Sequence, residues 1–211
     1  MKFPNAFEGV KKIYLAEILG LVATVLSLVM VAMTSFAGEN PAQGIVVAVA
    51  AILIVVFVLF RVAEILNIIG VSRASKDEEA FKTALYALLI GVVASLVGII
   101  FNKNETVSNL CTTVNRIQEI VASYYIITGL INLADRLANA EVSARGKKVR
   151  GLLVCIWTVS ALLSLVSIFF NNNQTAETVI GVIALIAGIA SVVAYFLYIG
   201  LLGKSKTMLS K

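Results

Sequence analysis

The sequence predicts an all-α polytopic membrane protein with six transmembrane helices. Of its 211 residues, 60 % are hydrophobic and only 14 % are charged, which leaves too little polar surface for a soluble globule. Six stretches approach the roughly 20 apolar residues that a membrane-spanning helix requires. Because lipid offers the backbone no hydrogen-bond partners, each stretch must be helical. The basic residues gather on one side of these stretches, as topology requires.

The first predicted hairpin extends from about residue 13 to about residue 71 (13–71) and follows a short cytoplasmic tail, 1–12. Its first span, from Ile13 to Phe36, is much longer than the apolar region of a signal peptide, so we expect it to be retained. A turn at 37–44 leads to the second span, which starts at Ile45. The many Val and Ile residues there would favour a strand in water, but the membrane imposes a helix.

The second predicted hairpin covers residues of about 83–137. A charged link precedes it, and Asp77, Glu78 and Glu79 in that link favour a helix start electrostatically. The third span ends near Phe101. The fourth begins somewhere in 107–114. Asparagines in the outer loops, Asn104 and Asn173, begin glycosylation sequons, but the loops are short, and we interpret these residues as turn and capping residues.

The third predicted hairpin covers residues of about 151–202, and a short cytoplasmic tail, 203–211, follows it. The link before it is the most basic segment, with the sequence RGKKVR at 145–150. Such a segment attracts anionic lipid headgroups, at about 1 kcal/mol per charge. The net charge of +5 therefore reflects topology, and no nucleic-acid partner is expected.

Orientation follows from the distribution of Lys and Arg, which tend to remain cytoplasmic near span ends. Of the 17 basic residues, only Lys103 and Arg116 fall on the outer side of the predicted spans. We therefore expect both termini in the cytoplasm. The protein is predicted to be a multi-pass protein of a bacterial plasma (inner) membrane.

A weak internal repeat of about 65–70 residues supports the three-hairpin interpretation. Sliding the chain by 69 positions matches Ser95 with Ser164, and Thr106 with Thr175. A weaker match pairs Ser27 with Ser164. The sequence thus predicts one helical hairpin used three times.

The fourth span is the least apolar, which makes it the candidate lining of a ligand site or transport route. The candidate residues are Asn115, Arg116, Glu119, Ser123, Tyr124 and Thr128. Arg116 and Glu119 share a helix face and can pair. If the span begins near Leu110, Glu119 lies close to mid-membrane, where an ionisable group is expensive and indicates function. If it begins near Ile117, both groups are interfacial and reach solvent.

A second set of polar residues is expected near the cytoplasmic ends of the spans. It comprises Glu17, Arg61, Glu64, Asn67, Asn132 and Asp135. Asn67 and Asn132 occupy equivalent repeat positions, so these residues could form a polar vestibule. The alternative is that they reach the interface or hold neighbouring helices together.

The remaining residues exclude several kinds of chemistry. The chain has no histidine, and its two cysteines are predicted at opposite membrane faces, so we expect no metal site, no cofactor and no enzymatic activity. The best-supported hypothesis is a small transporter, channel or substrate-binding membrane subunit. The alternative is a non-transporting scaffold or regulatory subunit. Besides the lipid bilayer, a second copy or a partner membrane subunit could contact the Gly-, Ala- and Ser-rich span six.

Overall fold

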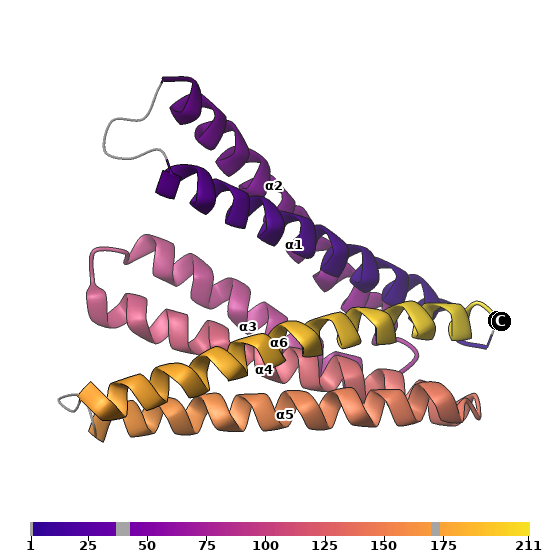
Figure 1. The fold of residues 1–211 in the computed structure, drawn as a ribbon. Helices are drawn as coiled ribbons and strands as arrows, with labels where there is room; N and C mark the ends of the chain where they lie inside the picture. The colour runs from indigo at the N-terminus through magenta and orange to yellow at the C-terminus, as the bar shows by residue number, and fades with distance from the viewer. Residues whose placement is uncertain (1, 37–42, 170–173) are drawn as a thin grey trace.

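A computed structural model describes residues 2–36, 43–169 and 174–211, without the side chains of 164–169 and 174–180. In these ranges the chain forms six α-helices (Figure 1). They are α1 (Pro4–Phe36), α2 (Gln43–Ala74), α3 (Ala80–Ile100), α4 (Glu105–Arg136), α5 (Ala140–Phe169) and α6 (Gln174–Leu209). Within the described residues, five helical segments are long and apolar enough to cross a membrane: α1, α2, α3, α4 and residues Gly181–Leu209 of α6.

Several helices extend further than their apolar stretches predict. α1 starts at Pro4, so the expected tail forms its first turns, and α5 starts at Ala140, so the basic stretch 145–150 is helical. These segments contain Lys, Arg, Glu and Ala, which form helices well. A loss of hydrophobicity therefore marks the edge of the apolar segment and not the end of the helix.

The six helices form a closed ring in chain order. Each helix packs against its sequence neighbours, and α6 packs against α1. α1 begins and α6 ends at one end of the bundle, which we call the terminal end; the opposite end, where α3 turns into α4, is the hairpin end (Figure 1). Toward the hairpin end, α1 and α2 lean away from the other helices. The helices of this ring therefore lie close together at the terminal end and spread apart at the hairpin end.

The hydrophobic core fills the half of the bundle nearer the terminal end. Its largest fully buried side chains include Ile13, Phe81, Ile126, Ile127, Leu130, Leu133, Leu201 and Leu202. Phe81 packs so closely on α4 that a Cβ at Gly129 would lie 2.5 Å from its ring. Nearer the hairpin end, large apolar side chains such as Ile54 and Ile99 are exposed, which suits contact with lipid acyl chains.

Two glycines let α1 and α2 touch near the terminal end. A Cβ at Gly9 would lie 2.4 Å from the carbonyl oxygen of Gly70, and a Cβ at Gly70 would lie 2.7 Å from that of Gly9. Only hydrogen fits at either position without moving a backbone. Small residues drive helix association in lipid because they allow this kind of approach.

Acidic residues in the link between α2 and α3 form hydrogen bonds with both α1 and α4 and an ion pair with α4. The acidic residues of this link are predicted to favour the start of α3 electrostatically, and the side chain of the N-cap residue Glu79 makes no capping hydrogen bond there. Asp77 instead accepts hydrogen bonds from the Ala6 backbone N–H (2.8 Å) and the Asn5 side chain (3.0 Å), so it caps α1. Glu78, whose side chain is 3 % exposed, accepts a hydrogen bond from Asn132 (2.8 Å) and pairs with Arg136 (2.9 Å).

The predicted capping role of Asn104 is confirmed. Asn104 is the N-cap residue of α4, and its side-chain oxygen accepts a hydrogen bond from the Val107 N–H at 3.2 Å. Its repeat counterpart Asn173 and residues 37–42 of the expected turn lie outside the described residues, and the last two residues of that turn, 43 and 44, belong to α2.

Candidate functional site

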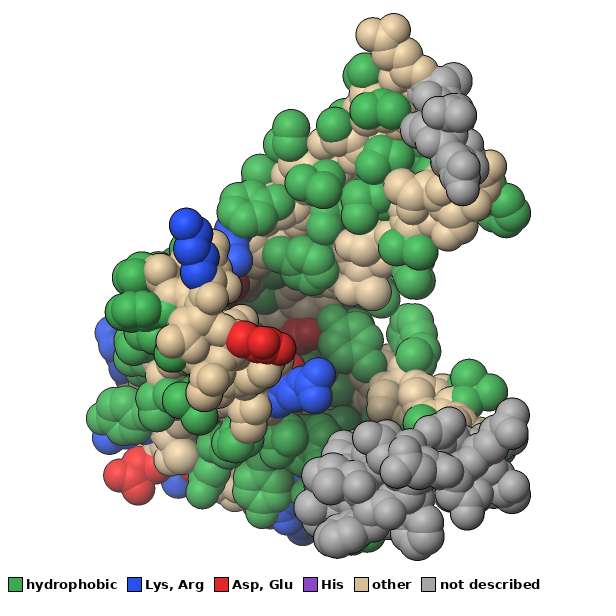
Figure 2. All heavy atoms as spheres, turned by 90° about the vertical axis from the view of Figure 1, so that its left-hand side faces the viewer, with side chains coloured by type: hydrophobic (Ala, Val, Ile, Leu, Met, Phe, Trp, Pro, Cys, Tyr) green, Lys and Arg blue, Asp and Glu red, His purple; other side chains and the backbone are tan. Residues whose placement is uncertain are grey.

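A cavity of about 980 Å³ lies between the leaning α1–α2 pair and helices α3, α4 and α6. Figure 2, viewed from the hairpin end, shows it as a deep hollow with acidic side chains inside. Its polar lining residues are Glu17, Thr24, Arg61, Glu64, Asn67, Ser95, Asn115, Gln118, Glu119, Ser123, Ser191, Tyr195 and Tyr198. The volume is within the range of small-molecule sites.

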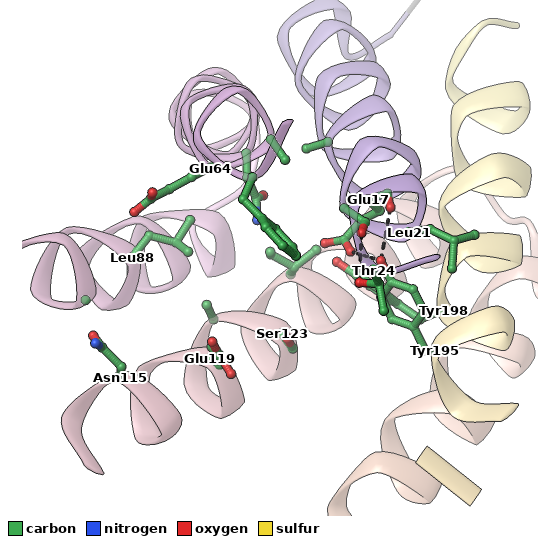
Figure 3. Close-up of a pocket in the computed structure, with 18 of the residues that line it drawn as sticks. Glu17, Leu21, Thr24, Glu64, Leu88, Asn115, Glu119, Ser123, Tyr195 and Tyr198 are labelled. Atoms are coloured by element: carbon green, nitrogen blue, oxygen red, sulfur yellow. Dashed lines mark hydrogen bonds between the residues drawn. The ribbon is translucent and has the colours of Figure 1, made fainter. Parts of the chain in front are cut away.

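Glu17 forms the wall of the cavity where α1 meets α6 (Figure 3). The Tyr195 hydroxyl lies 3.0 Å from both a carboxylate oxygen and the backbone oxygen of Glu17, and it donates to this residue. Tyr198, one turn further along α6, is 5 % exposed. Glu17 is thirteen residues from the start of α1, which at 1.5 Å per residue is about 20 Å from the terminal end.

α2 contributes an ion pair and an amide to the opposite wall. Arg61 and Glu64 are one turn apart and pair at 2.7 Å, with both side chains partly exposed. The guanidinium of Arg61 also lies over the ring of Phe57, 5.3 Å from its centroid. The side-chain oxygen of Asn67 is buried and has no hydrogen-bond partner in the described part of the protein.

One stripe of α4 lines the cavity along the helix. Asn115, Gln118, Glu119, Ala122, Ser123 and Ile126 have the spacing of one helix face. Asn115 donates a hydrogen bond to the Ser95 hydroxyl of α3 at 3.2 Å. Gln118 lies against Gly91 of α3, where a Cβ would come within 2.6 Å of its amide carbon. One hydrogen bond and one close packing contact therefore join α3 and α4 at the cavity.

α4 starts at Glu105, before both of the membrane entry points considered for the fourth span, Leu110 and Ile117. Glu119 is fourteen residues inside the helix, about 21 Å at 1.5 Å per residue, and it lines the cavity. Arg116 is exposed and does not line the cavity. Glu119 is thus not at a helix end.

The other candidates from span four lie on a different face. The guanidinium of Arg150 in α5 lies over the Tyr124 ring, 5.4 Å from its centroid, and donates a hydrogen bond to the Thr128 hydroxyl at 3.2 Å. Neither Tyr124 nor Thr128 lines the cavity. These two residues join α4 to α5.

The expected inner polar set divides into two groups. Glu17, Arg61, Glu64 and Asn67 line the cavity. Asn132 instead binds Glu78 at the terminal end, and exposed Asp135 lies 3.8 Å from the Lys147 ammonium. Asn67 and Asn132 therefore do not meet in a shared vestibule.

Sequence reasoning missed Ser95, Gln118, Tyr195 and Tyr198. The spacing of Gln118 from Asn115 and Ala122 places it on the polar stripe of α4, so helical periodicity could have identified it. Tyr195 had no such signal, because its partner Glu17 is 178 positions away in the chain.

The geometry as a whole is consistent with an α-helical membrane protein that contains a polar cavity. No protein-family model, curated protein or solved structure that was compared with the chain matches it.

Proposed function

We propose that the protein binds a small solute in this cavity, either as a transporter or as the substrate-binding membrane subunit of one. The observation that carries the proposal is the group of polar and charged side chains that five apolar helices place on the lining of one cavity, among apolar lining residues. Ionisable groups inside a membrane are costly, and they usually mark a ligand site or a pathway. A scaffold acting through its outer surface would be expected to have a close-packed centre.

The closed terminal end favours a transporter or binding subunit over an open channel. Leu130 and Leu202 each lie one turn beyond a lining residue, Ile126 and Tyr198, toward the terminal end, and both are fully buried, so the described core closes this end of the cavity. A solute that enters from the hairpin end would stop there until the helices move. A transporter that works by alternating access must keep one end of its cavity closed while the other end is open.

We further propose that the terminal end is cytoplasmic. Fourteen of the 17 basic residues lie in the tails, links and helix ends at the terminal end of the bundle; the other three are Arg61, Lys103 and Arg116. Basic residues are concentrated in this way at the cytoplasmic ends of membrane spans. The cavity would then open to the outside. The closed ring of sequential hairpins also supports the proposed three-hairpin repeat.

Cysteine labelling in intact cells tests this proposal. In a background with Cys111→Ala and Cys155→Ala, single cysteines replace Ser123 in the cavity, Leu89 on the lipid-facing side of α3, and Leu130 in the core. A charged, membrane-impermeant thiol reagent added outside should label Ser123→Cys. It should not label Leu89→Cys, which lipid covers, or Leu130→Cys.

Two further single cysteines test the orientation. Lys103→Cys should react from outside, and Lys148→Cys should react only after permeabilisation. The proposal is wrong if Ser123→Cys reacts no faster than Leu89→Cys, or only from the cytoplasmic side. Size-exclusion chromatography of each variant confirms that it is folded.

A further inference from the structure

The charges that line the cavity are unbalanced. Three carboxylates line it, from Glu17, Glu64 and Glu119 on three different helices (Figure 3). Among the described lining residues, Arg61 supplies the one guanidinium. Arg61 already pairs with Glu64. Within the described residues, Glu17 and Glu119 take part in no ion pair. Even if the neighbouring Arg116 is counted, three acidic groups face two basic ones.

This imbalance has a consequence for what can enter the cavity. A carboxylate surrounded by hydrocarbon and protein is stabilised mainly by a counter-charge or by hydrogen bonds. Glu17 receives a hydrogen bond from Tyr195. Glu119 takes part in no hydrogen bond or close ion pair among the described side chains, and the exposed Arg116, one turn away on α4, attracts it electrostatically. A cation in the cavity would supply the missing counter-charge, whereas an anion would be repelled.

The size and walls of the cavity favour an organic cation over a bare metal ion. At about 980 Å³ it is much larger than an ion, and no three acidic, Cys or His residues of the described chain lie close enough together to hold a metal. The aromatic rings of Phe60, Tyr195, Phe196 and Tyr198 also line it. Aromatic faces attract organic cations and contact their apolar parts.

Besides its charge and its aromatic walls, the cavity has amide oxygens that favour a cation. The side-chain oxygens of Asn67, Asn115 and Gln118 are buried on lining residues, and none has a hydrogen-bond partner in the described structure. Buried polar atoms in proteins are normally paired. All three atoms are acceptors, so they match a ligand that is positively charged or rich in donors.

We infer that the cavity binds an amphipathic organic cation, with its charge between Glu17 and Glu119 and its apolar body against the aromatic rings. The inference rests on the proposed function and names the ligand class of the same site. Among the described lining residues, the guanidinium that could bind an organic anion, that of Arg61, is already paired with Glu64.

Binding of two ions with the same shape and opposite charge tests the ligand class. The full-length protein in lipid nanodiscs is titrated with tetraphenylphosphonium and, separately, with tetraphenylborate, and empty nanodiscs give the lipid background. We expect saturable binding of the phosphonium and at least about tenfold weaker specific binding of the borate.

Three isosteric variants locate the site. Glu17→Gln and Glu119→Gln should each weaken phosphonium binding by about tenfold or more, since each removes a carboxylate from the lining. Glu79→Gln is the matched control, because its side chain is 89 % exposed at the terminal end, and it should bind like wild type. Glu119→Gln breaks no hydrogen bond in the described structure, so it tests the inference even if Glu17→Gln does not fold.

The inference is overturned if the phosphonium shows no saturable binding above the nanodisc background, if the borate binds as tightly, or if neither cavity variant differs from Glu79→Gln. Cysteine labelling distinguishes these outcomes from failure of the proposed function. If Ser123→Cys is accessible from outside but the phosphonium does not bind, the cavity is a binding site for another class of ligand. If Ser123→Cys is inaccessible, both proposals fail.

Discussion

Replacing Gly9 by Ala tests the contact that brings α1 and α2 together. The added Cβ would lie 2.4 Å from the Gly70 carbonyl oxygen and 2.7 Å from the Ala74 backbone nitrogen, whereas ordinary contact begins at 3.4 Å. The two backbones must therefore separate by about 1 Å. Overpacking of this kind costs about 1–3 kcal/mol, and a rigid backbone neighbour favours the upper part of that range.

Gly151→Ala provides the matched control, because a Cβ at Gly151 in α5 meets nothing within 4 Å. Both variants gain the same helix propensity, at most about 1 kcal/mol, so their difference isolates the overpacking cost. Equilibrium unfolding in mixed micelles should show Gly9→Ala to be less stable than Gly151→Ala by about 1–3 kcal/mol. Equal stability within about 0.5 kcal/mol would refute the close crossing of α1 and α2.

Two further predictions concern the terminal end. Asp77→Ala should lower the free energy of unfolding by about 1 kcal/mol, because α1 loses its cap, while Glu79→Ala should change little; equal effects would contradict the capping role. The hydrogen bond from Lys204, together with its charge, lowers the pKa of Glu141. Stabilisation by this pair should therefore be present above the unfolded-state pKa and be lost as the pH falls through the folded-state pKa. The stability difference between wild type and Glu141→Gln should vanish in acid, and a constant difference in pH titrations of unfolding would contradict the pairing.

The number of helices and their approximate places could be predicted from the sequence, because span length and hydrophobicity have a direct physical cause in the thickness of the bilayer. The helix ends could not. Residues 4–12 and 140–150 are charged enough to look like tails and links, yet they continue α1 and α5. Apolar length indicates where lipid ends, whereas capping residues such as Asp77 and Asn139 determine where the helices begin.

Part of the candidate site could also be predicted. Glu119, Asn115 and Ser123 were identified because polar residues stand out in an apolar span, and they do line the cavity. Tyr124 and Thr128 are also polar, but they contact Arg150 of α5. Which face of α4 lines the cavity depends on how the helices pack, and the sequence of α4 alone does not show this. The pairing of Glu17 with Tyr195 joins the two ends of the chain, and no local pattern indicates it.

The most direct test of the account is a cryo-electron microscopy structure of the protein in a lipid nanodisc. We expect α1 and α2 to lean away from the other helices, and Glu17 and Glu119 to face an aqueous cavity within the thickness of the bilayer. A close-packed centre without a cavity, or a Glu119 side chain outside the lipid layer, would contradict it.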